Sequence, residues 1–148
     1  MAEQKITAQA THEQLLYASI LEKGMLLGLV LMFITFAIYV FEILPAVVPL
    51  DKVSDYWNQP VHLYLEVIKT DFLNWEHHPT GWSWLKLVGN GDFLNFIPIA
   101  ILSGVTIMCY LSIVPGLFKR GDKAYAIMAL AEAAILTLAA SGLLAVGH

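Results

Sequence analysis

The feature that most constrains this chain is a pair of long apolar runs on either side of a short charged turn. The first run covers residues 93–118 without a charged side chain, and the second covers residues 124–148 with one acidic side chain, Glu132. The turn between them, residues 119–123, reads Lys-Arg-Gly-Asp-Lys. Because about 20 helical residues cross a hydrocarbon core about 30 Å thick, each run is long enough to span a membrane. The sequence therefore predicts a transmembrane helical hairpin.

A third apolar run lies near the start of the chain, over residues 24–45. It is uncharged until Glu42, and Pro45 and Pro49 are expected to end its helix. The composition, 58% hydrophobic and 14% charged, is too apolar for an ordinary soluble domain. We therefore expect an all-α integral membrane protein with three transmembrane helices and an interfacial amphipathic helical segment between the first and the second.

These runs divide the chain into alternating membrane and extramembrane segments. The N-terminal segment is amphipathic, and it either lies along the membrane surface or leads straight into the first span. The expected segments are the cytoplasmic N-terminal segment (1–23), the first span (24–45), the periplasmic or interfacial segment (46–92), the second span (93–118), the cytoplasmic turn (119–123) and the third span (124–148).

The orientation follows from the positions of the basic side chains. The N-terminal segment and the turn must lie on the same side of a three-span protein, and together they hold five of the eight basic residues, namely Lys5, Lys23, Lys119, Arg120 and Lys123. The positive-inside rule places this side in the cytoplasm and the C-terminus in the periplasm. We expect the bacterial inner (cytoplasmic) membrane as the location.

The segment between the first two spans is rich in aromatic side chains. It contains all four tryptophans, Trp57, Trp75, Trp82 and Trp84. Apolar residues at helical spacing predict a helix over residues 60–75 that lies parallel to the membrane, and a shorter helix is expected over residues 82–88. Asp92 is expected to cap the start of the second span. This aromatic layer is interpreted as a headgroup-level belt, with docking of a periplasmic protein as the alternative.

The most informative polar residue is Glu132, because an ionisable group inside a span is costly unless it is neutral, paired or near water. Helical rise places it about 12 Å from the start of its span. The same depth along the other spans reaches Thr35, Cys109 and Tyr110, which are its expected hydrogen-bonding neighbours. A protonated glutamate bonded to a neighbouring helix is one interpretation. A proton or cation relay, or a polar contact in a quinone pocket, is the other.

Small residues recur at steps of four in all three spans. This spacing lets helix backbones approach closely, so some of these faces are expected to pack against other chains. The expected packing residues are Gly24, Gly28, Ala100, Gly104, Ala129, Ala133, Thr137 and Ser141. Pro115 and Gly116 are expected to bend or end the second span.

One cluster of metal-ligand residue types is present, Glu76-His77-His78. Imidazole and carboxylate groups suit zinc, copper or iron, but adjacent histidines project in different directions and no HExxH motif accompanies them. A polar loop at the water boundary is the other interpretation. Covalent haem is excluded because the chain has a single cysteine. We expect no cofactor bound by this chain alone, with lipid or quinone contact as the remaining candidates.

The sequence carries no GxSxG, Walker A or GxGxxG motif, so an autonomous enzyme is not expected. A net charge of −4 offers no basic patch for nucleic acid. The three-span layout with an aromatic outer segment resembles small accessory or anchor subunits of bacterial energy-converting complexes. We therefore expect an accessory or anchor subunit of a respiratory or electron-transfer complex, with other integral subunits and lipids as partners. The alternative is a transporter partner, or a homo-oligomeric channel or proton-path subunit that uses Glu132.

Overall fold

The computed structural model describes residues 9–143, and this part of the chain is helical. The elements in order are α1 (His12–Val40), α2 (Leu50–Tyr56), α3 (Val61–Val67), the π-helical η1 (Ile68–Leu73), the 3₁₀-helical η2 (Gly81–Leu87), α4 (Gly91–Leu94), α5 (Phe96–Arg120) and α6 (Lys123–Ala140). Three helical stretches, His12–Val40, Gly91–Arg120 and Lys123–Ala140, have the length and apolar composition of membrane spans. The predicted fold class is confirmed: the protein is all-helical, with short helices between the first and second candidate spans.

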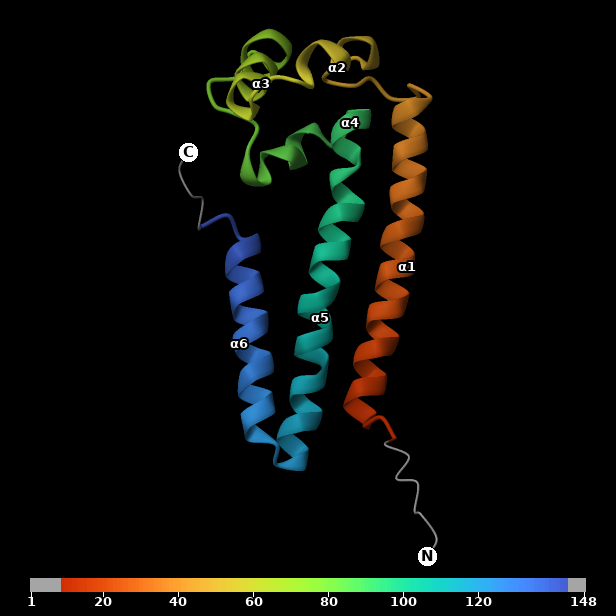
Figure 1. Ribbon diagram of the computed structural model, residues 1–148, viewed down its shortest axis with the longest axis vertical. Coiled ribbons are helices and arrows are strands. Elements are labelled where there is room, and N and C mark those ends of the chain that lie inside the picture. The colour runs from red at the N-terminus through yellow and green to blue at the C-terminus, as the bar shows by residue number, and fades with distance from the viewer. Residues whose placement is uncertain (1–8, 144–148) are drawn as a thin grey trace, which may run out of the picture.

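The three long helices lie side by side in one layer, with α5 in the middle (Figure 1). Helix α5 packs against both neighbours, whereas α1 and α6 touch at no more than a few points within the described residues. The short helices gather across one end of the layer, and the α5–α6 turn lies at the other (Figure 1). We call the group of short helices (residues 46–92) the intervening layer, and the end that holds the α5–α6 turn the turn end.

Helix α1 is longer at its start than the predicted span of residues 24–45. Thr11 accepts a hydrogen bond from the Gln14 amide and its own amide donates to the Gln14 side chain, a capping box that starts the helix at His12. From His12 on, the N-terminal segment is therefore part of the same helix as the span. At the other end the helix stops at Val40, and Glu42 takes a left-handed backbone conformation with φ of 51°. The chain thus turns away before the prolines are reached.

Close packing between α1 and α5 depends on the two glycines of α1. A Cβ atom added to Gly24 would lie 2.5 Å from Val105 Cγ2, and one added to Gly28 would lie 2.5 Å from Leu102 Cδ2. Carbon atoms in contact are normally about 3.5–4.0 Å apart, so only glycine admits these side chains of α5. The small-residue spacing of α1 therefore serves a contact within the chain.

The small-residue stripe of α6 is divided between two environments. Ala126, Ala129 and Ala133 are buried on a helix that packs against α5. Thr137 and Ser141 are exposed, and their hydroxyls donate to the carbonyls of Ala133 and Leu138 on the same helix. On α5, a Cβ atom at Gly104 would meet nothing within 4 Å. The alanines nearer the turn end therefore pack against α5, whereas Thr137 and Ser141 remain exposed.

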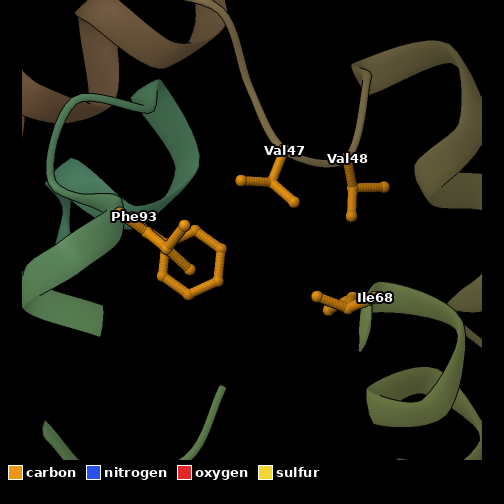
Figure 2. Close-up of a cluster of buried hydrophobic side chains, with 5 residues drawn as sticks. Val47, Val48, Ile68 and Phe93 are labelled. Carbon is orange, nitrogen blue, oxygen red and sulfur yellow. The ribbon is translucent and has the colours of Figure 1, made fainter. Parts of the chain in front are cut away.

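A small apolar cluster holds the intervening layer against the layer of spans. Figure 2 shows Val47 and Val48, from the loop before α2, pointing toward Phe93 of α4 and Ile68 of η1. Leu87 of η2 completes this buried cluster. Residues from four separate segments therefore share one core outside the long helices.

Asp92 anchors that core, and its expected role as a helix cap is wrong. Its two carboxylate oxygens accept hydrogen bonds from the amides of Val47 and Val48, each 3.1 Å long. Asn90 and Asn95 occupy the cap positions of α4 and α5 instead. The local sequence favoured a cap because the true partners of Asp92 lie more than forty residues earlier in the chain.

The remaining elements agree in part with the expected ones. The helix expected over residues 60–75 is present as the continuous pair α3 and η1, and the one expected over residues 82–88 as η2. Helix α2 was not expected. Pro115 does not end the second span, because α5 continues to Arg120 and ends at Gly121, where φ is 83°. One missing amide donor is tolerated inside a long apolar helix, where neighbouring groups can compensate.

Candidate functional groove

A groove of about 640 Å³ lies at the turn end, where α1, α5 and α6 meet. It includes a carboxylate from α6, tyrosines from all three helices and an ion pair between α1 and α5. Its lining residues are Thr11, Glu13, Gln14, Tyr17, Tyr110, Ile113, Leu117, Arg120, Asp122, Tyr125, Met128, Ala129 and Glu132. This groove brings together more polar side chains of the spans than the two other pockets identified among the described residues.

Glu13 of α1 and Arg120 of α5, which both line the groove, form an ion pair. Glu13 is only 7% exposed, and Arg120 Nε also lies 3.7 Å from the Asp122 carboxylate. Gly116 makes room for the pair, because a Cβ atom there would lie 3.0 Å from Glu13 Oε1. The guanidinium therefore serves two carboxylates of its own chain. This pair was not predicted from the sequence. The sequence indicated it only through an acidic residue in the N-terminal segment and basic residues in the turn.

The floor of the groove is formed by contacts between α1 and α5. The rings of Tyr17 and Tyr110 meet edge to face, with centroids 5.7 Å apart and an interplanar angle of 69°. Next to Tyr110, Cys109 is fully buried, and its thiol lies 3.7 Å from the Tyr17 carbonyl oxygen. The cysteine therefore faces α1, while Tyr110 contributes to the groove.

Glu132 lies on the α6 side of the groove and is exposed. No hydrogen bond or ion pair to its carboxyl group is found among residues 9–143. Of its expected neighbours, Tyr110 lines the same groove and Cys109 turns away toward α1. The Glu132 carboxyl group is therefore available to a group other than those of the described residues.

The third expected neighbour, Thr35, is placed elsewhere. Its hydroxyl donates to the Met32 carbonyl 3.2 Å away, and the side chain is buried. Because Gly28 already packs on Leu102, Thr35 lies closer to the intervening layer than to the turn end. Counting depth from residue 24 misplaced the level of α1, which begins at His12, and Tyr17 takes the position that Thr35 was expected to fill.

The Glu76-His77-His78 cluster does not form a metal-binding group. Within the described part of the chain, no set of three or more His, Cys, Asp or Glu side chains is arranged to hold a metal ion. His78 Nε2 instead lies 3.4 Å from a Glu66 carboxylate oxygen, and Lys69 Nζ lies 3.1 Å from the other. These side chains form a charged network on the surface of the intervening layer.

A stack of aromatic rings connects the intervening layer with α5 and α6. Trp82 stacks on Trp84, Trp84 on Phe96, and Phe96 on Phe93, with centroids 5.5–6.0 Å apart. The indole N–H of Trp82 donates to the Ala140 carbonyl at the end of α6, 3.0 Å away. These two tryptophans therefore have structural contacts, whereas Trp57 is 83% exposed.

Comparison with known proteins gives one clear relationship. An archaeal protein from Archaeoglobus fulgidus, described as an uncharacterized protein, is 48% identical over 136 residues, which cover 92% of this chain and 91% of the relative. The chain belongs to the same family as this archaeal protein. Because the match covers 92% of the chain, it includes at least most of each candidate span. No family model matches the chain, and no solved structure matches it.

Proposed function

We propose that this protein is a small integral accessory or anchor subunit of a multi-subunit membrane complex, of the respiratory or electron-transfer class. The observation that carries the proposal is the single layer formed by α1, α5 and α6 (Figure 1). Buried residues make up only 11% of the most apolar stretch of α1 and 17% of the corresponding stretch in each of the other two helices. Both broad faces of the layer thus remain available to neighbouring helices.

One uncovered region is suited to helix packing. A second groove of about 440 Å³ lies between α5 and α6 on the half nearer the intervening layer. Its walls include the small residues Ala100, Ser103, Gly104, Ala139 and Ala140. In lipid, close backbone contact is a main source of helix association, and such small residues permit it. This region supports the assignment of other integral membrane subunits as partners.

The location and orientation belong to the same proposal. We place the protein in a prokaryotic cytoplasmic membrane, such as a bacterial inner membrane, with the turn end in the cytoplasm. The support is the short turn itself, which carries Lys119, Arg120 and Lys123 within five residues. The intervening layer then lies on the outer side, where it is available to a periplasmic or extracellular protein, and the span surfaces contact lipid.

The second candidate is a transport role, as a transporter partner or as a homo-oligomeric channel or proton-path subunit. It is favoured by Glu132, whose carboxyl group is exposed well inside α6 without a partner in the described residues. In that case Glu132→Gln would abolish proton-coupled flux in proteoliposomes. Unchanged flux in this neutral variant would contradict a relay.

The proposed function is tested by the stoichiometry of the protein after gentle extraction from its own membrane. We expect co-purification with other integral subunits and with chains that carry haem or iron–sulfur groups. Gly104→Leu should weaken that association, because it fills the uncovered groove of α5, whereas Ala131→Leu, on an exposed position outside the grooves, should not. A pure homo-oligomer would contradict the accessory-subunit proposal.

A further inference from the structure

The groove at the turn end has the size of a small-molecule site and lies between helices that qualify as membrane spans. Its volume of about 640 Å³ falls within the about 300–1,000 Å³ of typical ligand pockets. On α5 it extends only from Tyr110 to Arg120, which is less than half of that helix. A transmembrane helix would need a surface along the whole layer, so the groove is better matched to a compact ligand.

We infer that this groove binds a lipid-soluble quinol, a hydroxylated aromatic ring carried on an apolar tail. The inference concerns binding alone, and it holds whether or not the chain is an accessory subunit. Three properties of the lining side chains carry it: their polarity, their aromatic content and the depth of the Glu132 carboxyl group.

The lining side chains match a ring that carries hydrogen-bond donors. Ile113, Leu117 and Met128 provide apolar contact, and the Tyr17–Tyr110 pair offers ring faces and edges on which a further ring can stack. The Glu132 carboxyl group, which has no partner among the described residues, accepts a hydrogen bond from a ring hydroxyl.

A phospholipid headgroup does not fit the same positions. The basic side chain of the described lining, Arg120, already contacts Glu13 and Asp122, so this lining offers a phosphate no cation without a carboxylate partner. Glu132 lies nine residues beyond the start of α6, which corresponds to about 13 Å of helical rise. Headgroups stay at the membrane surface, whereas a neutral quinol ring can reach this depth.

The test uses the full-length protein in lipid nanodiscs and a benzoquinol probe with a ten-carbon tail that carries a photoreactive diazirine. We expect saturable labelling that maps to the groove-lining parts of α1, α5 and α6 and is displaced by the same quinol without the diazirine. At probe concentrations below saturation, Glu132→Leu and Tyr110→Phe should both reduce the labelling, because each removes a hydrogen-bonding group from the ring site. The reduction for Glu132→Leu should be at least about tenfold.

Matched controls separate binding from folding. Glu132→Gln keeps a carbonyl acceptor and should restore most of the labelling lost in Glu132→Leu. Tyr39→Phe makes the same chemical change as Tyr110→Phe on a residue outside this groove, and Thr137→Val removes a hydroxyl from α6 outside it, so both should label within about twofold of the parent protein. All variants should keep the helix content of the parent.

Several results would overturn the inference. Labelling spread evenly over all three spans would show that the groove holds no ring-binding site. Labelling of Glu132→Leu equal to that of the parent would show the same. Displacement of the probe by anionic phospholipid at constant probe concentration would assign the groove to lipid. Capture of another protein by a photoreactive amino acid placed at Met128 in native membranes would assign it to a partner helix. A homo-oligomeric state, by contrast, would contradict the proposed function and leave this inference intact.

Discussion

Gly28→Ala should destabilise the protein, although alanine is normally the better residue in a helix. The new Cβ atom would lie 2.5 Å from both Leu102 Cγ and Leu102 Cδ2. Since carbon atoms in contact prefer about 3.5–4.0 Å, α1 and α5 must separate by about 1 Å or Leu102 must leave its rotamer. Overpacking of this kind costs about 1–3 kcal/mol.

Gly104→Ala is the matched control because it makes the same change in an equally apolar helix. Its Cβ atom would meet nothing within 4 Å. The substitution should therefore leave the free energy of unfolding unchanged or raise it by up to about 1 kcal/mol, the helix-propensity advantage of alanine over glycine. The difference between the two variants isolates the cost of the steric contact.

The measurement is unfolding in mixed micelles of increasing sodium dodecyl sulfate content, followed by circular dichroism. In a Leu102→Ala background the contacting atoms are absent, so the cost of Gly28→Ala should largely disappear. Equal effects of Gly28→Ala and Gly104→Ala, or an undiminished cost in the Leu102→Ala background, would refute the packing described for α1 and α5.

Three further predictions concern the intervening layer. Asp92→Ala removes the acceptor of three backbone amides, those of Val47, Val48 and Phe93, and should cost about 1–3 kcal/mol in the same unfolding assay, with faster hydrogen exchange of the Val47 and Val48 amides; unchanged exchange would contradict the anchor. Trp82→Phe keeps a ring in the aromatic stack but loses the bond to Ala140, so exchange should accelerate at the end of α6 and not at its start. Burial first, and then the charge of Asp92, raise the pKa of Tyr64. Its protonated form is therefore favoured by folding, and the resulting stability should be present below the unfolded pKa of about 10 and lost as pH rises through the folded value. Tyr64→Phe should remove this pH dependence, measured as the difference in unfolding between pH 9 and pH 11.

The sequence was sufficient for the spans and insufficient for their exact register. Long apolar runs have few alternatives, so the three spans followed from residues 24–45, 93–118 and 124–148 directly. The start of α1 could not be predicted from its apolar run, because Glu22 and Lys23 suggested a boundary where the helix in fact continues. That error shifted the expected neighbour of Glu132 from Tyr17 to Thr35.

Long-range polar contacts were the second limit. Asp92 bonds to amides more than forty residues away, and Glu13 pairs with a residue more than a hundred positions later. Helical spacing describes only neighbours on the same helix, so it contains no information about these pairs. Glu132 and Tyr110 line the same groove because a short turn fixes the relative depth of α5 and α6, but the expected hydrogen bond between them is not among the contacts of the described residues.

The bond between Trp82 and the end of α6 implies an order of assembly. During synthesis from the N-terminus, α1 and α5 are both complete before α6 exists, and their glycine-mediated contact requires nothing from the third helix. The aromatic stack on Phe96 likewise uses only residues that are already made. Helix α6 is therefore the last of the three to be made, and the residues that its alanines and the Ala140 carbonyl contact all precede it in the chain.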